Sequence, residues 1–394
     1  MRCEYRQLGD VAIQFIDGDR GKNYPSNNEF SNVGYCLFLN AKNVTPDGFS
    51  FGEVSFITQK KDAMLRKGKL EKNDVVLTTR GTVGNVAFYG ERVLYSNVRI
   101  NSGMLIIRPD PSVFCPEYVY WLFRSDVIQD QIKRFRSGTA QPQLPISSIK
   151  KFEIPLVDIK TQKKIAAILS ALDEKIAINR AINENLERQA QALFSSLYER
   201  SNTEVGYTDM IQILGGGTPK TGENTYWNGN IAFFTPKDVG TPYTLITEKT
   251  ITEEGLSHCN SRLYPVNTVF VTARGTVGKV CMSGVPMAMN QSCYALVGKE
   301  IHQLLVYFYT LKVVDRLKHK ASGAVFDAIT TRDFESEQIM KLSDDDVTAF
   351  LRVVEPMFQE VLNNNIENLR LSTLRDSLLP KLMSGEIDVS AVQL

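Results

Sequence analysis

The chain contains two versions of one short segment. VVLTTRGTVGNVAF begins at Val75, and VFVTARGTVGKVCM begins at Val269, an offset of 194 residues. Near Ser137 and Ser322 the offset becomes 185 residues, and it stays at 185 through two long helical patterns. We therefore predict one architecture that is used twice within a single chain. Such a chain resembles a dimer with two different arms, and it can contact a partner whose two halves differ.

The two helical patterns have matching heptad spacing. Seam positions, mostly apolar, step by four and three residues from Ile165 to Leu197 and again from Phe350 to Leu382, where the second series includes Arg375 at the position of Ala190. This spacing is typical of coiled-coil helices about 50 Å long. The residues expected at the interface between the two helices are Leu172, Ile176, Asn179, Asn183 and Leu186 in the first, and Met357, Val361, Asn364, Asn368 and Leu371 in the second.

Both patterns place two asparagines at matching seam positions. Asparagine at a coiled-coil seam costs stability but fixes register and partner. In an antiparallel pair the two sets of asparagines meet near the centre and can form hydrogen bonds, although a parallel pair would also align them. The symmetry of the repeat favours the antiparallel arrangement. Pro356, inside the second pattern, is expected to kink that helix or to mark its start.

The segments before each helical pattern have the character of mixed α/β domains. Short β-branched runs at 74–79 and 268–272 end in glycine turns, and the apolar spacing at 116–135 and 301–320 predicts helices. We predict an α+β fold in which two mixed α/β domains are separated by two long helices that form an antiparallel coiled coil, with a pseudo-two-fold internal repeat. The expected parts are a first domain at 1–155, a first spacer helix at 156–200, a second domain at 201–342, and a second spacer helix with the C-terminal tail at 343–394.

Several classes of function receive no support from the sequence. It has no GxxxxGK[ST] phosphate loop, no GxGxxG nucleotide fingerprint and no Asn/Asp-Pro-Pro-aromatic motif of amino-methyltransferases. Its three histidines lack the spacing of a zinc site. We therefore expect a binding protein without catalytic residues, metal ligands or a cofactor of its own.

The composition indicates a cytoplasmic protein. No apolar run approaches the ~20 residues of a membrane span, and the N-terminus lacks the apolar stretch of a secretory signal. The six cysteines, Cys3 among them, are scattered without a CxxC motif, which is typical of reduced thiols. The net charge is only +1, but basic residues gather at 60–80 and 133–151.

The repeated RGTVG turns offer groups suited to nucleic acid. Glycines allow backbone N–H groups to approach a phosphate, threonine supplies a hydroxyl, and arginine supplies a fork suited to phosphate or to a guanine edge. A β-turn whose arginine pairs with a nearby acid remains the alternative. Lysines and asparagines of neighbouring loops complete the candidate DNA-contacting set, which is Lys22, Asn40, Lys42, Asn43, Arg80, Thr82, Thr218, Lys220, Lys237, Arg274, Thr276 and Lys279.

Four segments together resemble the specificity subunits of type I restriction-modification enzymes. They are GGGTPKTGENTYWNGNIAFFTPKDV, RGTVG followed by Asn290-Gln291, ENLERQAQALFSSLY, and NNIENLRLSTLRDSLLPKLMSGEI. The resemblance covers essentially the whole chain. It implies two target-recognition domains that each read one half of a split site on double-stranded DNA. It also implies an antiparallel helical spacer that docks two methyltransferase (modification) subunits, motor-nuclease (restriction) subunits that complete the complex, and a non-catalytic role for this chain.

The first domain departs from this pattern. It has LGDVAIQFIDGDRGKNYP in place of a GGTP-type opening, and Asn101-Ser102 in place of Asn290-Gln291. A spacer about 50 Å long exceeds one ~34 Å turn of duplex, so we expect a bipartite, non-palindromic site with unread bases between its halves. The alternative function is a protein-interaction scaffold whose helices bind partners and whose domains read peptides.

Overall fold

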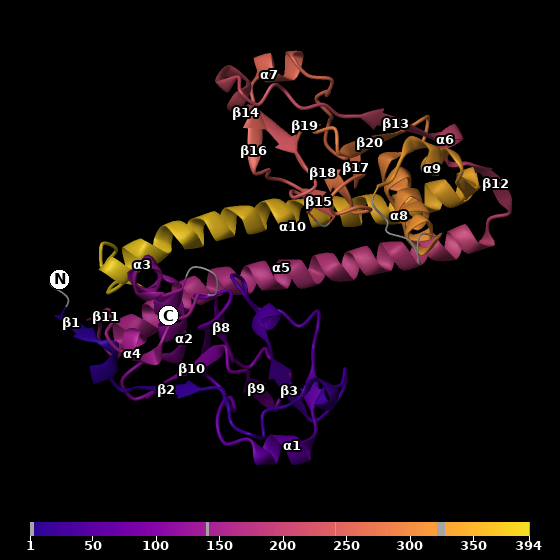
Figure 1. The fold of residues 1–394 in the computed structure, drawn as a ribbon. Coiled ribbons are helices and arrows are strands. Elements are labelled where there is room, and N and C mark those ends of the chain that lie inside the picture. The colour runs from indigo at the N-terminus through magenta and orange to yellow at the C-terminus, as the bar shows by residue number, and fades with distance from the viewer. Residues whose placement is uncertain (1–3, 139–141, 241, 321–327, 394) are drawn as a thin grey trace. The chain divides into compact units, whose positions relative to one another are not determined.

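The computed structural model of the chain describes residues 4–138, 142–240, 242–320 and 328–393. Cys3 and Ser322 lie outside the described residues. The chain divides into two units, unit 1 with residues 1–175 and 371–394 and unit 2 with residues 176–370. The division cuts both long helices, so each unit holds one globular domain and a stretch of each helix (Figure 1). The globular domain of unit 1 is called the first domain, and the globular domain of unit 2 is called the second domain.

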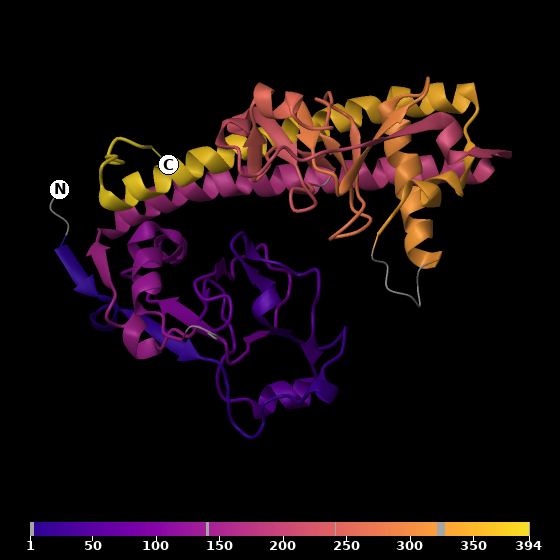
Figure 2. The ribbon, with the colours of Figure 1, turned by 45° about the horizontal axis from the view of Figure 1, so that its top comes forward.

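The two long helices are α5 (Ile159–Arg200) and α10 (Asp344–Ser384). In unit 1, Asp173 of α5 bonds with Arg375 of α10, and Lys164 bonds with the chain just beyond α10. In unit 2, hydrogen bonds join Asn179 to Asn368 and Asn183 to Asn364. As the residue numbers rise along α5, the numbers of their partners in α10 fall. The predicted antiparallel pairing is therefore confirmed in each unit (Figure 2).

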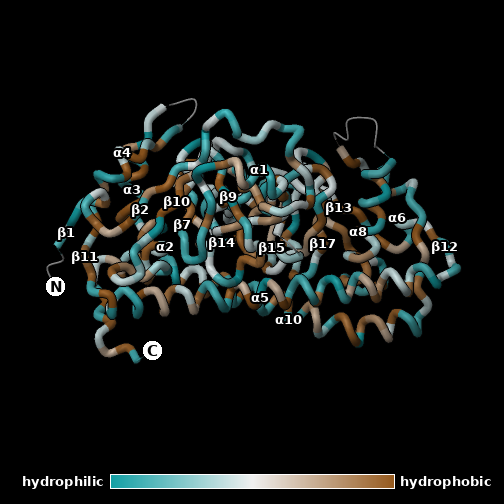
Figure 3. The backbone as a smooth tube through the Cα atoms, turned by 90° about the horizontal axis from the view of Figure 1, so that it is seen from below, coloured by the Kyte–Doolittle hydropathy of each residue, from teal (hydrophilic) through white to brown (hydrophobic). Residues whose placement is uncertain are grey.

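Pro356 lies within α10, twelve residues after its first residue Asp344, so it does not mark the start of the helix. Its side chain is exposed, away from the seam. Along both long helices hydrophobic and hydrophilic residues alternate, as amphipathic helices require (Figure 3). The seam positions Ile176 and Val361 are buried, because this is the face that each helix turns toward its partner.

The first domain is built on a four-stranded antiparallel sheet whose central strands are fully buried. Val75, Val76 and Leu77 form one of these strands and have no exposed surface, so β-branched and aliphatic residues pack on both faces. The order of strands in this sheet is β2 (Ile13–Asp17), β10 (Met104–Pro109), β7 (Val75–Thr78) and β8 (Val86–Phe88). A three-stranded sheet has the order β6 (Phe56–Ile57), β3 (Cys36–Leu39) and β9 (Val98–Ile100). Two further pairs are β1 (Glu4–Gln7) with β11 (Glu153–Leu156), and β4 (Val44–Thr45) with β5 (Gly48–Phe49). Its helices are α1 (Gln59–Met64), α2 (Pro116–Arg124), α3 (Asp126–Phe135) and α4 (Ile146–Ile149), with short 3-10 turns at Leu8–Asp10, Asn27–Glu29 and Ala41–Asn43.

The second domain repeats this plan with one added strand. Its main sheet has the order β13 (Ile211–Gly215), β20 (Cys293–Gly298), β17 (Val269–Thr272), β18 (Val280–Ser283) and β15 (Tyr243–Thr244). Smaller sheets join β16 (Lys249–Ile251), β14 (Trp227–Phe234) and β19 (Met287–Met289), and β12 (Thr203–Gly206) with β21 (Gln338–Lys341). Its helices are α6 (Tyr207–Met210), α7 (Glu253–Ser257), α8 (Gln303–Lys320) and α9 (Thr331–Glu335), with a 3-10 turn at Asn224–Tyr226.

The strand orders show that the repeat is structural. The order β2-β10-β7-β8 corresponds to β13-β20-β17-β18, and the parallel pair β3 and β9 corresponds to the parallel pair β14 and β19. The predicted fold, two mixed α/β domains with two long antiparallel helices, is therefore confirmed.

One detail differs from the expectation, because the helix predicted over 116–135 is broken. Ser125 has an extended backbone, and its hydroxyl donates to the carbonyl of Leu122, which ends α2 before α3 begins.

Each domain packs against the stretch of α5 and α10 in its own unit. In unit 2 the shared core is aromatic: Phe194 of α5 stacks on Phe308 of α8 at 5.2 Å between ring centroids, and Phe350 of α10 closes on both. In unit 1, Leu169 and Leu382 from the two helices join the core of the first domain. The helical pair is therefore the base on which each domain is fixed.

Candidate nucleic-acid interface

The two RGTVG turns have the same geometry. Each follows a central strand, and a threonine at the end of that strand organises it: the Thr78 hydroxyl donates to the Thr82 carbonyl, and the Thr272 hydroxyl donates to the Thr276 carbonyl. The same two hydroxyls accept from the backbone N–H groups of Asn85 and Lys279, each at 2.9 Å. The turn is thus a fixed element of the repeated frame.

The glycines of both turns are required by the backbone. Gly81 and Gly84 have φ of 73° and 105°, and Gly275 and Gly278 have φ of 82° and 74°, a region that side chains disfavour. A Cβ placed on Gly81 would meet nothing within 4 Å, and one on Gly275 would meet only Pro236 at 3.8 Å. The tips of the turns are therefore open, and recurrence of the glycines reflects the shape of the turn.

The arginines of the turns are held by their backbones alone. The Arg80 N–H donates to the Gly103 carbonyl at 3.1 Å, and the Arg274 N–H donates to the Ser292 carbonyl at 3.2 Å. Arg274 is exposed and Arg80 is half-buried. Within the described ranges, neither guanidinium makes a hydrogen bond or ion pair. The alternative was a turn arginine that pairs with a nearby acid. Among the residues that the structure describes, no acid pairs with either arginine.

Two lysines gather beside the turn of the second domain. The side chain of Lys318, in the last turn of α8, lies on Gly278, where an added Cβ would come within 2.5 Å of its Cε. Burial, together with the nearby charge of Lys279, lowers the pKa of Lys318. Among the described residues no carboxylate pairs with either ammonium group. Lys279 and Lys318 lie close to each other, and Arg274 stands at the start of the same turn; we call these three cations the turn cluster.

The first domain has a weaker counterpart of this cluster. Lys133 of α3, which matches Lys318 at the 185-residue offset, is paired with Asp130 at 3.0 Å. Arg134 and Arg136 beside it are exposed. Sequence reasoning missed Lys318 as a candidate, although the basic last turn of α8, with its neighbouring Lys320, is visible in the sequence.

The GGGTPK loop and Asn290-Gln291 meet in the second domain. A Cβ on Gly216 would lie 2.2 Å from the Asn290 carbonyl oxygen, so only glycine allows this close approach. The Thr218 hydroxyl then donates to the side-chain oxygen of exposed Gln291. Thr276 donates to the Pro236 carbonyl at 3.2 Å. Segments 215–220, 235–238, 274–279 and 290–292 are thus joined into one surface, which we call the second-domain loop surface.

The first domain builds the same contact from a different sequence. A Cβ on Gly18 would lie 2.1 Å from the Asn101 carbonyl oxygen, as Gly216 does against Asn290. The side-chain oxygens of Asn101 and Asn290 each accept a backbone N–H two residues on, at 2.9 and 3.0 Å. In place of the threonine, Arg20 reaches the Ser102 carbonyl at 3.3 Å. Arg20, which also pairs with Asp17 at 3.0 Å, was not among the predicted residues, and its signal in the sequence is Gly18, the glycine that follows β2.

The remaining candidates of the first domain divide into free and structural groups. Lys22 is exposed and makes no hydrogen bond or ion pair in the described part of the chain. Lys42 is exposed and pairs with Glu53 at 2.7 Å. Asn40 caps a 3-10 turn by accepting the Lys42 N–H at 2.9 Å. Asn43 is 1% exposed and donates to two backbone carbonyls, at 3.0 and 2.7 Å, so it supports the loop and is not presented at the surface.

The other two candidate lysines of the second domain are both exposed. Lys220 makes no side-chain hydrogen bond or ion pair within the described ranges, and its carbonyl accepts the Trp227 indole N–H at 3.3 Å. Lys237 lies 3.7 Å from Glu248, with both side chains largely in solvent, a pairing that is weak in water. Both lysines remain available to an anionic partner.

The seam asparagines form a polar layer in unit 2. Asn179 donates to Asn368 at 3.0 Å, Asn364 donates to Asn183 at 2.9 Å, and Asn183 donates to Asn365 at 3.0 Å. These bonds match the arrangement expected of an antiparallel pair. Around them Ile176 is buried. The remaining seam residues are buried (Val361) or half-buried (Leu172, Leu186, Met357 and Leu371).

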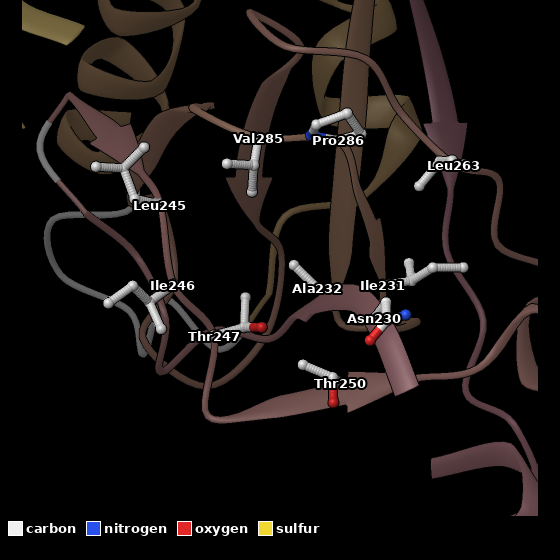
Figure 4. Close-up of a pocket in the computed structure, with 10 residues that line it drawn as sticks. All are labelled: Asn230, Ile231, Ala232, Leu245, Ile246, Thr247, Thr250, Leu263, Val285 and Pro286. Carbon is white, nitrogen blue, oxygen red and sulfur yellow. The ribbon is translucent and has the colours of Figure 1, made fainter. Parts of the chain in front are cut away.

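A shallow hollow in the second domain has a different character. Its lining is mainly aliphatic and carries no charged side chain, which makes it unsuited to phosphate; it comprises Asn230, Ile231, Ala232, Leu245, Ile246, Thr247, Thr250, Leu263, Val285 and Pro286 (Figure 4). Over the described ranges no cluster of three or more histidine, cysteine or acidic residues has the arrangement of a metal site. In those same ranges no helix has the length and apolar character needed to span a membrane.

Comparison with known proteins gives a consistent result. A family model for the type I restriction modification DNA specificity domain matches residues 2–188 and 201–341. The HindI specificity subunit of Haemophilus influenzae is 24% identical over 455 residues, covering 94% of this chain and 98% of that protein. The MjaIX specificity subunit of Methanocaldococcus jannaschii is 24% identical over 379 residues, covering 88% and 86%.

A solved structure shares the fold. The crystal structure of a type I restriction-modification S subunit from M. genitalium aligns with a TM-score of 0.62 and 15% sequence identity, covering 97% of this chain and 96% of that one. At this level of identity the likeness concerns the architecture alone.

Proposed function

Because the chain belongs to the family of type I restriction modification DNA specificity domains, we propose that it selects the DNA sequence on which a type I restriction-modification complex acts. Each domain binds one half of a bipartite site on double-stranded DNA. The helices set the spacing of the halves and dock two methyltransferase subunits, and motor-nuclease subunits complete the complex. The chain itself is non-catalytic and carries no cofactor, so the chemistry belongs to its partners.

The observation that carries this proposal is the second-domain loop surface. Four segments that are distant in sequence are joined there by backbone and side-chain hydrogen bonds. The surface presents Arg274 and Lys279 of the turn cluster together with the free Lys220. Cations of this kind contact phosphates and hold a protein in position on duplex DNA.

The same surface supplies groups that distinguish bases. The amide of Gln291 is suited to the N6 and N7 edge of adenine, and the guanidinium of Arg274 is suited to guanine. Gln291 is exposed while its oxygen accepts from Thr218, which fixes the direction of its N–H₂ donor. We therefore assign base reading to Gln291 and Arg274, and phosphate contact to Lys220, Lys279 and Lys318.

The first domain reads a different half-site with a related frame. Arg20 and Lys22 follow the close contact of Gly18 with Asn101, and Arg80 extends from the equivalent turn. Since Arg20 stands where the second domain has Thr218, and Ser102 stands where it has Gln291, the two domains prefer different bases. A bipartite, non-palindromic target follows from this difference.

The length of the helices supports a spacer role. The 42 residues of α5 form one continuous helix of about 63 Å at 1.5 Å per residue. This is nearly twice the ~34 Å of one duplex turn. Two readers fixed to such a helical pair leave unread base pairs between their half-sites.

The test is methylome sequencing of a host with and without this chain. The expected result is one bipartite methylated motif that depends on the chain. Exchange of the second domain for that of a relative should change one half of the motif only. A change in both halves, or no motif at all, contradicts the assignment of one half-site to each domain.

Binding measurements separate this function from a peptide-reading scaffold. We expect the chain assembled with its methyltransferase to bind specific duplex with an affinity that falls steeply with salt, by about one unit of log-log slope per phosphate contact. A scaffold would show neither sequence preference nor that slope. Equal binding to specific and scrambled duplex at every salt concentration would favour the scaffold.

A further inference from the structure

The asparagine layer does not distinguish one helix from the other. Asn179 bonds with Asn368, which is the counterpart of Asn183 at the 185-residue offset. Asn183 in turn bonds with Asn364, the counterpart of Asn179. If α5 paired with the α5 of a second chain, Asn179 would meet Asn183 of that chain and make the same kind of bond. The asparagines therefore fix register but leave the choice of partner open.

A charged contact in unit 1 breaks this symmetry. Asp173 of α5 accepts from Arg375 of α10, and Arg124 of α2 approaches the same carboxylate at 3.5 Å. The side chain of Arg375 is only 12% exposed and that of Asp173 only 27%. Charges held this far from water depend on each other, because an unpaired one would lose hydration without compensation.

The matching positions in unit 2 are apolar. At the 185-residue offset Asp173 corresponds to Phe358 and Arg375 corresponds to Ala190. Phe358 is 1% exposed and Ala190 is fully buried, and both belong to the aromatic core around Phe308, whose ring lies 5.5 Å from that of Phe358. One pair of equivalent positions on the two helices thus holds an ion pair in unit 1 and packed hydrocarbon in unit 2.

This difference has a consequence for pairing between chains. In an α5–α5 pair, Asp173 of each chain would face Ala190 of the other. In an α10–α10 pair, Arg375 would face Phe358. Both arrangements place each charge against an apolar side chain and break the Asp173–Arg375 bond, so that, among the described residues, Asp173 keeps only Arg124 at 3.5 Å and Arg375 keeps only the exposed Asp376 at 2.8 Å. The α5–α10 pair satisfies the charges and the aromatic core together.

We propose that Asp173 and Arg375 select the pairing of α5 with α10 and disfavour association of two copies of this chain through α5–α5 and α10–α10 pairs. The proposal rests on the helical seam and holds whether or not the domains read DNA. It assigns to the ion pair a role in partner choice that local stabilisation alone would not require.

The test uses the full chain with a thiol reporter. Position 181 lies midway between Asn179 and Asn183, so in an α5–α5 pair it would lie at the same level along the helices as position 181 of the other chain, and Ala181 is exposed on the outer face. Ala181→Cys is combined with Asp173→Phe and Arg375→Ala, which give unit 1 the residues that unit 2 uses. Each protein is refolded over a range of concentrations and treated with a flexible bismaleimide long enough to join the outer faces of two packed helices, about 20 Å apart. Molar mass is measured by light scattering, and peptides linked from 181 to 181 are measured by mass spectrometry.

We expect Ala181→Cys alone to remain free of the 181–181 link. The triple variant should form linked dimers, with a concentration for half-dimerisation at least about tenfold lower. The control is Ala181→Cys with Arg188→Ala, which removes an ion pair to Glu184 whose two side chains are each 71% exposed, and it should behave as Ala181→Cys alone.

Two results would overturn the proposal. One is a folded triple variant that stays unlinked, because the charges would then only stabilise unit 1. The other is a link of equal yield in Ala181→Cys alone. If circular dichroism shows that the triple variant does not fold, Ala181→Cys with Arg375→Ala replaces it. That variant removes only the cation, and absence of the link in its folded form equally refutes the proposal.

Discussion

Substitution of Gly216 by alanine tests how the second-domain loop surface is built. The added Cβ would lie 2.2 Å from the Asn290 carbonyl oxygen and 2.5 Å from that of Met289. Because a carbon and a carbonyl oxygen rarely approach closer than about 3.3 Å, the GGGTPK loop must move by roughly 1 Å. A shift of this size separates Thr218 from Gln291 and releases the group to which we assign base reading.

The size of the effect follows from two contributions. Overpacking of this kind costs about 1–3 kcal/mol of folding stability, which for a unit of this size lowers the melting temperature by about 2–4 °C per kcal/mol. Loss of one bidentate base contact costs about 1–3 kcal/mol of discrimination, or about 5- to 150-fold in relative affinity. The loss should concern only the half-site of the second domain.

The matched control is the preceding residue. Gly215→Ala adds the same methyl group where nothing lies within 4 Å, so it should leave both stability and discrimination unchanged. The assay compares duplexes altered in one half-site or the other, bound by the chain assembled with its methyltransferase. If Gly216→Ala and Gly215→Ala behave alike, the close contact does not position the reading groups and the reasoning is wrong.

Three further predictions concern the helical seam and the turn cluster. Asn364→Ala leaves the side-chain oxygen of Asn183 without its donor, and it should lower the free energy of unfolding by about 1–3 kcal/mol in denaturant titrations. The control Asn363→Ala, at an exposed position, should have little effect. Burial, with a contribution from the charge of Glu184, raises the pKa of Glu187 to about 7. Since that folded-state pKa lies above the unfolded value of about 4.5, stability should fall as pH rises from about 4.5 through 7. Glu187→Gln should remove this fall when denaturant midpoints are compared between pH 5 and 8, and an unchanged pH profile would show that this carboxyl is not responsible. Lys318→Ala should weaken binding to all sequences alike and reduce the log-log salt slope by about 1, and a change in sequence preference would place Lys318 on a base.

The sequence revealed the elements that depend on periodic spacing. Heptad steps and the doubled asparagines predicted the two long helices, and the antiparallel bonds between Asn179 and Asn368 agree with that prediction. The RGTVG repeat identified a common turn, because its glycines are demanded by local backbone conformation. Signals of this kind lie within a few consecutive residues, so one sequence is enough to see them.

The contact set of the domains was harder to predict. Asn43 has the composition of a base-reading residue, yet it is buried and saturated by two carbonyls of its own loop. Lys318 lies in a helix, far in sequence from the turn that it covers. Type and spacing of residues cannot distinguish a side chain that supports a loop from one that is presented by it.

What the sequence determined by itself is the repeat, the pairing of two long helices and the family resemblance, because each is written in local patterns. Only the tertiary structure showed that the contact of Gly18 with Asn101 in the first domain is equivalent to the contact of Gly216 with Asn290 in the second domain, although the surrounding sequences differ. It also decided that Asp173 meets Arg375 while their counterparts lie in an aromatic core. The physical reason is the same in both cases: close approach and burial arise between segments distant in the chain, and the folded backbone alone sets which segments meet.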